Sequence, residues 1–325
     1  MIEETSQQTV SARELAVSPS PHLRFGLSVN MIMYITLFAL MFPAAASIYF
    51  FGYYALSVIV VSVATAIVTE YLVKKLRGRA FVMDGSAIVT GLLLALIMPP
   101  TIPLWMVVVG AIFAIAIVKE AFGGLGHYIF NPTLGGMAFL YACFPIEMTT
   151  WVAPMGFGGD VITSAHPLSE AFIWQADKLS LYNELFLGNT SGALGETSVL
   201  FILIGGMLLI ALRIIDWRIP AAYIGTVALF SSVIGEDPIF YILAGGLMLG
   251  AFFLATDSVT SPLTRRGRII FGIGAGILLV LIRRYSDMTD GVAYSILLMN
   301  ALTPLIDRFI KVKPYGVKRI VKGNG

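Results

Sequence analysis

The chain has 325 residues, of which 58% are apolar and only 12% are charged, and its formal net charge is +2. A soluble domain carries about 25% charged residues, and a chain with a mean hydropathy of +0.87 has more apolar surface than a soluble protein of this size can bury. The composition therefore excludes a soluble enzyme, a disordered chain and a nucleic-acid-binding protein, and it predicts an all-α membrane protein. The single cysteine, Cys143, also excludes an intrachain disulfide framework and a cysteine-ligated metal centre built from this chain alone.

Ten stretches are apolar over about the 20 residues that a membrane-spanning helix needs. In chain order they cover 30–51, 54–73, 81–99, 103–119, 134–150, 197–214, 219–235, 238–256, 268–283 and 291–310. The fifth stretch is interrupted by Gly135, Gly136 and Pro145. The sequence thus predicts about ten transmembrane helices.

The basic residues predict how these spans are oriented. If the N-terminus is cytoplasmic and the spans alternate, all but three of the 21 Lys and Arg residues fall in cytoplasmic segments. The exceptions are Lys178, Arg283 and Arg284. Because cytoplasmic loops of membrane proteins carry an excess of Lys and Arg, we expect a multi-pass membrane protein with both termini in the cytoplasm.

Ten spans divide into two halves of five, and an odd number per half inserts the second half upside down. The predicted organisation is a cytoplasmic N-terminal segment (1–29), a first five-helix half (30–150), an extracytoplasmic loop (151–195), a second five-helix half (196–310) and a basic cytoplasmic tail (311–325). Spans 81–99 and 238–256 both combine glycines, a Ser/Thr/Asp cluster and a proline at or just after the end. Such paired interruptions are typical of broken helices in a 5+5 inverted repeat. The alternative is that small residues simply allow close helix packing.

Side-chain oxygens gather in and just after these two spans. They belong to Asp84, Ser86, Thr90, Asp257, Ser258 and Thr260. A carboxylate within the bilayer is costly and marks an ion path or a partnered site, so these six residues are candidates for an ion path. In the alternative interpretation Asp84 caps a helix start and Asp257 pairs with Arg265 or Arg266.

Two connecting segments carry helix-start signals. The glycine-rich segment 123–133 contains Gly123, Gly124 and Gly126 before an Asn-Pro pair, a pattern that fits either a phosphate site at a helix start or an ordinary loop. The outer element 188–198 ends in Glu196-Thr-Ser. We expect its hydroxyls to cap the sixth span and Glu196 to lie near the positive end of that helix.

Together these motifs resemble the RnfD/NqrB family. They are Asp84-Gly-Ser-Ala-Ile-Val-Thr-Gly with Pro99-Pro100, Gly123-Gly-Leu-Gly with Phe130-Asn-Pro, Ala255-Thr-Asp-Ser-Val-Thr with Arg265-Arg-Gly-Arg, and Asp290-Gly-Val-Ala-Tyr with Leu305-Ile-Asp. The resemblance runs in order from about residue 20 to 318, and the short N-terminal segment favours the Rnf branch over NqrB.

The resemblance implies a subunit of a complex in the plasma membrane of a prokaryote that moves electrons from reduced ferredoxin to NAD or a membrane carrier and pumps Na⁺ or H⁺. It implies other Rnf-type subunits (A, B, C, E and G) as partners, and no activity of the isolated chain. It also implies an FMN joined through its phosphate to a threonine of an outer loop, and it leaves open a second flavin such as riboflavin.

The chain departs from the family at the attachment position, because His166 stands where the acceptor threonine belongs. The surrounding motif residues are Asp160, Thr163, Ser164, Ala165 and Pro167. An imidazole has no hydroxyl and cannot form the phosphoester. We expect FMN to bind here without the usual ester, with His166 as a hydrogen-bond or charge partner of the phosphate. A neighbouring hydroxyl as acceptor and an empty site are the alternatives.

Two other functions fit the same layout. A stand-alone ion channel or secondary transporter would also be built from inverted repeats with glycines near the midplane. In the other alternative, the chain is a purely structural subunit that has lost its flavin chemistry, and His166 is a consequence of that loss.

Overall fold

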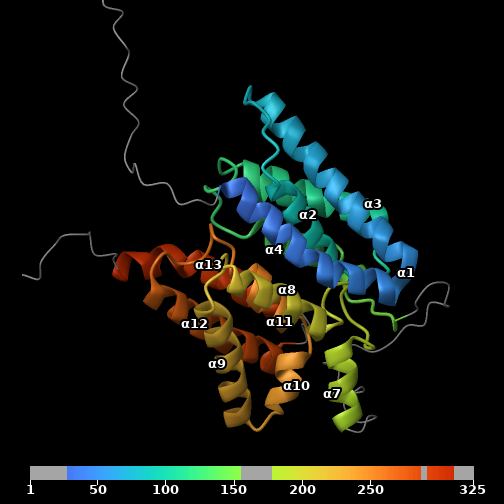
Figure 1. The fold of residues 1–325 in the computed structure, drawn as a ribbon, viewed down its shortest axis with the longest axis vertical. Coiled ribbons are helices and arrows are strands. Elements are labelled where there is room, and N and C mark those ends of the chain that lie inside the picture. Colours follow the sequence, from blue (N-terminus) through green and yellow to red (C-terminus); the bar gives the residue numbers. More distant parts are fainter. Residues whose placement is uncertain (1–27, 155–177, 287–290, 311–325) are drawn as a thin grey trace, which may run out of the picture.

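The computed structural model describes residues 28–154, 178–286 and 291–310, and the regular elements in these ranges are helices (Figure 1). The all-α prediction is therefore confirmed for the described part of the chain. The predicted flavin-motif residues, 160–167, lie outside the described residues, as do most of the two terminal segments.

The longest element, α1 (Val29–Leu76), consists of two predicted spans joined at a sharp bend. Gly52 has φ 69° and ψ −151° inside it, a conformation that glycine alone adopts without steric cost. The bend doubles the chain back on itself (Figure 1) and falls between the predicted spans 30–51 and 54–73. Among the described helices, α1 alone is long and apolar enough to cross a membrane. The helices α2 (Ser86–Leu96), α8 (Val199–Ala211) and α9 (Arg218–Ile234) are apolar but shorter.

The remaining helices follow the predicted spans but are more broken. After α2, the first half contains α3 (Leu104–Ile112), the π-helix η1 (Phe113–Glu120), α4 (Pro132–Cys143) and α5 (Pro145–Met148). The second half, beside α8 and α9, contains α10 (Pro238–Leu243), α11 (Leu247–Leu249), the π-helix η2 (Gly250–Leu254), α12 (Arg265–Tyr285) and α13 (Gly291–Phe309). One further helix, α7 (Lys178–Leu187), lies in the predicted extracytoplasmic loop 151–195. The predicted span 81–99 is helical only from Ser86 to Leu96, because Pro99 and Pro100 follow. The predicted span 238–256 is divided into α10, α11 and η2.

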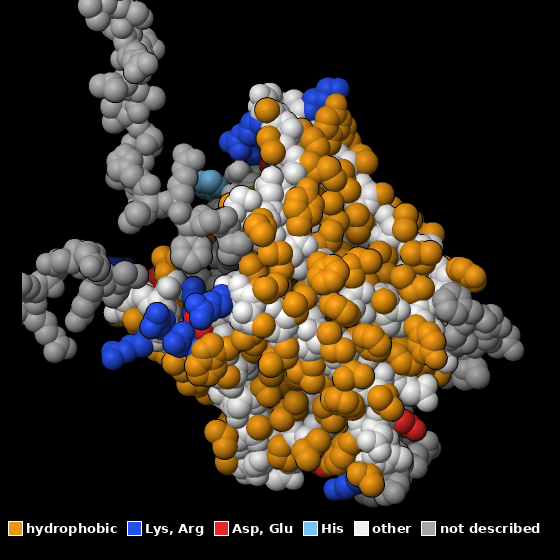
Figure 2. Space-filling model, in the orientation of Figure 1, with side chains coloured by type: hydrophobic (Ala, Val, Ile, Leu, Met, Phe, Trp, Pro, Cys, Tyr) orange, Lys and Arg blue, Asp and Glu red, His pale blue; other side chains and the backbone are white. Residues whose placement is uncertain are grey.

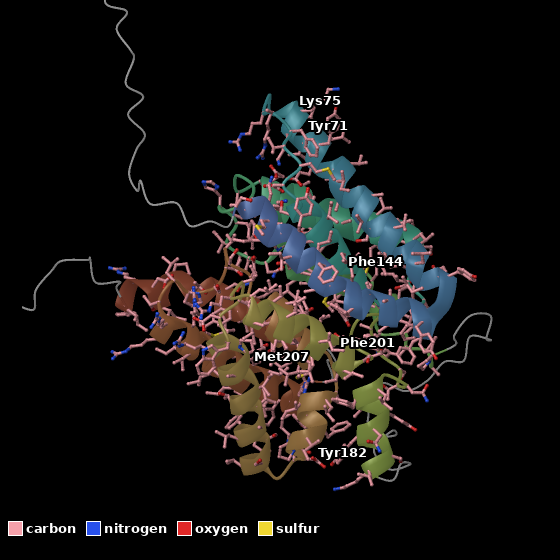
Figure 3. The ribbon with its side chains drawn as sticks, in the orientation of Figure 1. Tyr71, Lys75, Phe144, Tyr182, Phe201 and Met207 are labelled. Atoms are coloured by element: carbon pink, nitrogen blue, oxygen red, sulfur yellow. The ribbon has the colours of Figure 1, made fainter. Side chains whose placement is uncertain are left out.

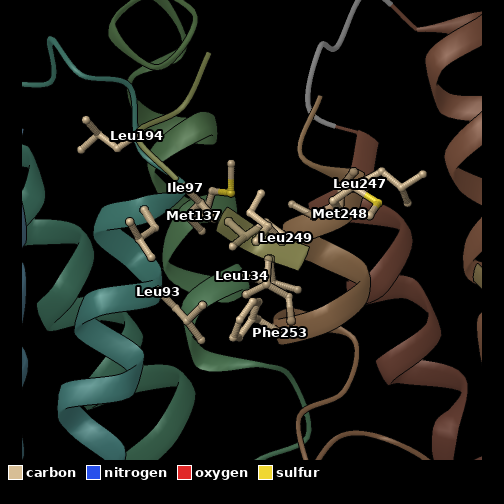
Figure 4. Packing of buried hydrophobic residues seen from close by; sticks show 14 of the residues in the cluster. Leu93, Ile97, Leu134, Met137, Leu194, Leu247, Met248, Leu249 and Phe253 are labelled. Atoms are coloured by element: carbon tan, nitrogen blue, oxygen red, sulfur yellow. The ribbon is translucent and has the colours of Figure 1, made fainter. Parts of the chain in front are cut away.

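The two halves pack against each other around one apolar core. Helices of the first half lie above those of the second half in Figure 1, and α1 contacts both α2 and α8. Figure 4 shows Leu93 and Leu134 of the first half facing Leu249 and Phe253 of the second. The broken helices α2 and α11–η2 therefore both contribute side chains to the core between the halves.

The surface is apolar over its middle and charged at its edges. Apolar side chains cover the centre of Figure 2, and Lys and Arg gather mainly at the top and left of the view. Tyr53, Leu229 and Val233 are 75%, 72% and 80% exposed. Figure 3 places Tyr71 and Lys75 at one end of the molecule and Tyr182 of α7 near the opposite end. This distribution is that of a protein whose middle faces lipid rather than water.

The close approach of α8 to α1 depends on Gly205. A Cβ at this position would meet the Ala39 carbonyl oxygen of α1. We expect Gly205→Val to lower the free energy of unfolding by about 1–3 kcal/mol, because overpacking forces the helices apart. Thermal unfolding of the purified protein measures the effect.

The matched control is Gly225→Ala in α9, where a Cβ meets nothing within 4 Å. It should be neutral or stabilising, because alanine favours a helix more than glycine does. Equal destabilisation by both substitutions would contradict this account of helix packing.

Candidate functional site

A polar cavity of about 80 Å³ lies where the two halves meet. Four of the six predicted ion-path residues line it: Ser86, Thr90, Asp257 and Ser258. The fold therefore brings together residues from the third span and from the end of the eighth, which are far apart in the sequence. Its other polar lining residues are Thr36, Lys119, Tyr128, Asn131, Thr133 and Thr256, and its apolar walls include Val89, Leu93, Phe252 and Phe253.

The first-half side of the cavity contains a buried network of charged side chains. The Lys119 ammonium is 2.6 Å from Ser86 Oγ and 3.3 Å from Glu70 Oε2. Glu70 also lies 2.5 Å from Lys74 Nζ. Ser86 Oγ donates to Asp84 Oδ1 over 2.5 Å, so Asp84 connects to Lys119 through a single hydroxyl.

Burial makes this network unusual. Lys119 is 1% exposed and Glu70 is 2% exposed. Ionised side chains are placed in apolar surroundings only when they are paired, because desolvation costs several kcal/mol per ion. From the sequence, Lys119 was expected in a cytoplasmic segment and Glu70 was not singled out. The signal that would have found Glu70 is a carboxylate inside the predicted span 54–73.

Asp84 also lies at a helix start, as in the alternative interpretation of this residue. Its carboxylate accepts from the backbone N–H of Ser86 over 2.9 Å, at the first residue of α2. Thr90, one turn later, donates to the Ser86 carbonyl oxygen over 2.9 Å. The helix-cap and ion-path interpretations of Asp84 are therefore compatible.

The second-half side of the cavity centres on Asp257. Tyr128 Oη donates to Asp257 Oδ1 and Thr260 Oγ1 donates to Asp257 Oδ2, both over 3.3 Å. None of the ion pairs within the described ranges joins Asp257 to Arg265 or Arg266, so the alternative interpretation of Asp257 is not supported. Burial, followed by the charge of Asp257, raises the pKa of Tyr128 well above its ordinary value, and the phenol remains a hydrogen-bond donor at neutral pH.

The glycine-rich connection is a tight loop that closes this end of the cavity. Gly123, Gly124 and Gly126 have φ values of 125°, 91° and 91°. The amides of Gly123 and Gly124 donate to the carbonyl oxygens of Glu120 and Lys119 over 3.1 Å each. Because these amides are used within the loop, the loop interpretation is favoured over the phosphate site.

The outer element 188–198 is largely buried between the halves. Ser198 is the N-cap of α8, but its side chain makes no capping hydrogen bond. Within the described residues, Thr197 Oγ1 and Ser198 Oγ have no hydrogen-bond partner. The predicted hydroxyl cap is therefore wrong, and Glu196 lies against Gly246 of another broken helix instead.

Comparison with known proteins identifies the family of this chain. The sequence model of the NQR2, RnfD, RnfE family matches residues 16–316. The chain belongs to this family. It is 44% identical over 319 residues to the D subunit of the proton-translocating ferredoxin:NAD(+) oxidoreductase complex of Clostridium ljungdahlii, with 93% of this chain and 96% of that protein covered.

Two further relatives carry related names. The D subunit of the Na(+)-translocating ferredoxin:NAD(+) oxidoreductase complex of Acetobacterium woodii is 45% identical over 312 residues, covering 95% of this chain and 97% of that protein. The D subunit of the ion-translocating oxidoreductase complex of Methanosarcina acetivorans is 37% identical over 302 residues, covering 92% and 96%. The family resemblance that the motifs indicated is thus confirmed.

The Glu70–Lys119 pair should contribute strongly to stability. Lys119→Met leaves the Glu70 carboxylate in a buried site with Lys74 as its remaining partner, and we expect a loss of about 3–5 kcal/mol in the free energy of unfolding. Glu70→Gln combined with Lys119→Met removes both charges and should recover part of that loss. Chemical or thermal unfolding in detergent gives both values.

Lys75→Met is the control, because Lys75 is exposed one position from Lys74. Its substitution should change the free energy of unfolding by less than about 0.5 kcal/mol. Strictly additive effects of the Glu70 and Lys119 substitutions would show that the two side chains do not interact.

Proposed function

We propose that this chain is the membrane subunit of a complex that couples electron transfer from reduced ferredoxin, to NAD or a membrane carrier, to translocation of Na⁺ or H⁺. The family and the names of the relatives support this function. The observation that carries the ion-path part is the buried charged cavity between the broken helices of the two halves. The chain acts together with other Rnf-type subunits (A, B, C, E and G) and has no independent activity.

In this proposal the chain crosses the plasma membrane ten times, as a 5+5 inverted repeat with both termini in the cytoplasm. The bend at Gly52 supports two spans within α1. The apolar middle of the surface and the basic side chains gathered at its edge support a belt that faces lipid (Figure 2). The breaks in α2 and in α10–α11 occur in the third and eighth spans, which correspond in the two halves.

In this proposal a cation is bound by oxygens in and beside the cavity. Asp257, Ser86, Thr90 and Ser258 line it, and Asp84 and Thr260 lie behind this lining, hydrogen-bonded to Ser86 and Asp257. Na⁺ is bound by such oxygens, and a proton is carried by the carboxylates themselves. The Lys119 ammonium offsets the negative charge of Glu70 and Asp84. Cation binding is therefore weak enough for the ion to leave the site.

FMN is proposed at Asp160–Pro167, held by non-covalent contacts in which His166 faces the phosphate. When bound, the flavin supplies an electron-accepting ring, and the part of this chain is to hold and orient it. Riboflavin is proposed as a second cofactor. No site is assigned to it, because the cavity of about 80 Å³ is smaller than the roughly 300–1,000 Å³ of sites for molecules of this size.

Removing the Asp257 carboxylate tests the ion path. In proteoliposomes that contain the whole complex, we expect Asp257→Asn to reduce ferredoxin-driven Na⁺ or H⁺ uptake to background, because the cation loses its charged ligand. Asp307→Asn is the control, since Asp307 contacts the backbone N–H of Leu263 outside the cavity. Uptake that is unchanged in Asp257→Asn would remove this residue from the path.

Reconstitution of the isolated chain distinguishes a stand-alone channel or transporter from a subunit of a complex. A stand-alone channel or transporter would move ions when reconstituted alone, whereas a subunit of a complex should be inert until its partners are added. Transport by the isolated chain would therefore replace the proposed function.

The mode of flavin binding is tested by His166→Thr. The unmodified chain should show no flavin fluorescence as a denatured gel band, although the native complex contains FMN. After His166→Thr and coexpression with a flavin transferase, the band should become fluorescent, because a hydroxyl now stands at the acceptor position. A native complex without FMN would favour a purely structural subunit.

A further inference from the structure

The chain break between α10 and α11 lies near the middle of the predicted span 238–256. Gly245 and Gly246 both have left-handed backbone conformations there, with φ 64° and 69°. The break leaves the carbonyl end of α10 and the amide end of the segment 247–254 inside the bundle. Such ends need partners, because backbone polar groups in apolar surroundings are costly when unpaired.

Arg283 of α12 satisfies the carbonyl end. Its guanidinium donates to the carbonyl oxygens of Tyr241 over 2.6 Å and of Ala244 and Gly245 over 2.9 Å each. It also lies over the Tyr241 ring, 5.6 Å from its centroid. A cation at this position complements the negative end of the α10 dipole. The neighbouring Arg284 is more exposed and lies 3.8 Å from Glu236.

Glu196 occupies the amide end. A Cβ at Gly246, the N-cap of α11, would overlap the Glu196 carboxylate. An anion is stabilised at the start of a helix by the unpaired N–H groups and the positive end of the dipole. The break is therefore held between a cation on its carbonyl side and an anion on its amide side.

The segment that carries Glu196 is also bound to the other broken helix. Gly195 N donates to the Leu96 carbonyl oxygen over 2.6 Å, and Leu194 N donates to that of Met98 over 3.0 Å. Ser47 Oγ donates to the Leu194 carbonyl oxygen over 2.9 Å. The outer element thus joins the end of α2 to the start of α11, and α11 leads through η2 to the cavity residues Phe252–Asp257.

We propose that Glu196 and Arg283 are positioning residues that hold this break closed toward the outer side and thereby set the outer boundary of the ion path. The proposal rests on the proposed function, in which the cavity belongs to that path. Neither residue lines the cavity; both act through the backbone of α10 and α11. When either charge is lost, the ends of α10 and α11 are no longer held together, and ions enter the path from the outer side without electron transfer.

The first test measures ions moved per electron in proteoliposomes containing the whole complex. Glu196→Gln and Arg283→Gln should lower this ratio about fivefold, in the range of ordinary coupling energies, while ferredoxin oxidation continues. Arg283→Lys, which keeps the charge, should restore part of the ratio. Arg284→Gln, next to Arg283 and in contact with Glu236, is the control and should leave the ratio unchanged.

The second test measures access to the break directly. Met248 is 7% exposed, and Cys143 is the chain's one cysteine. In a Cys143→Ser background, Met248→Cys should react about fivefold faster with an impermeant thiol reagent from the outer side when Glu196→Gln or Arg283→Gln is added. This readout does not depend on the cavity carboxylates, so it separates failure of this proposal from failure of the ion path.

Unchanged labelling and an unchanged ion ratio in assembled variants would overturn the proposal. Failure of both glutamine variants to assemble, with no rescue by Arg283→Lys, would assign the two residues to folding alone and would overturn it as well.

Discussion

Helix ends buried inside the bundle are the constraint on which the rest of this structure depends. Unpaired backbone N–H and C=O groups in apolar surroundings cost several kcal/mol each, so every break must be matched by a partner from elsewhere. The carbonyls at the end of α2 accept from Leu194 and Gly195, and those of α10 accept from Arg283. The breaks therefore tie distant segments together, and they hold open the polar space between the halves.

The same breaks allow charge to enter an apolar core. The helix α2 begins at Ser86 instead of continuing as part of a longer helix. At this start the Ser86 hydroxyl contacts the buried Lys119 ammonium, and the Asp84 carboxylate is connected to it through that hydroxyl. On the opposite side, the turn after η2 presents Asp257 to Tyr128. A continuous helix at either place would bury these side chains against its own neighbours. Under the proposed function, these breaks provide both the ion path and the means to control it.

Local signals predicted the positions of the breaks but not their partners. Pro99-Pro100 and Gly245-Gly246 are visible in the sequence because proline and glycine act on their own backbone. The expected capping of α8 by Thr197 or Ser198 was wrong, because the outer element turns inward and Glu196 lies against Gly246 instead. The alternative in which Asp257 pairs with a nearby arginine is not supported either, since its partner is Tyr128, 129 positions away.

The sequence by itself determined the all-helical membrane class, the family and the segments that form the broken helices, because composition and motif order are properties of the chain alone. The tertiary structure decided that Glu70 and Lys119 pair, that the two groups of side-chain oxygens share one cavity, and that Arg283 reaches α10. Apolar periodicity shows that a helix is buried. It does not show which distant helix it meets, because that choice depends on how the whole bundle packs.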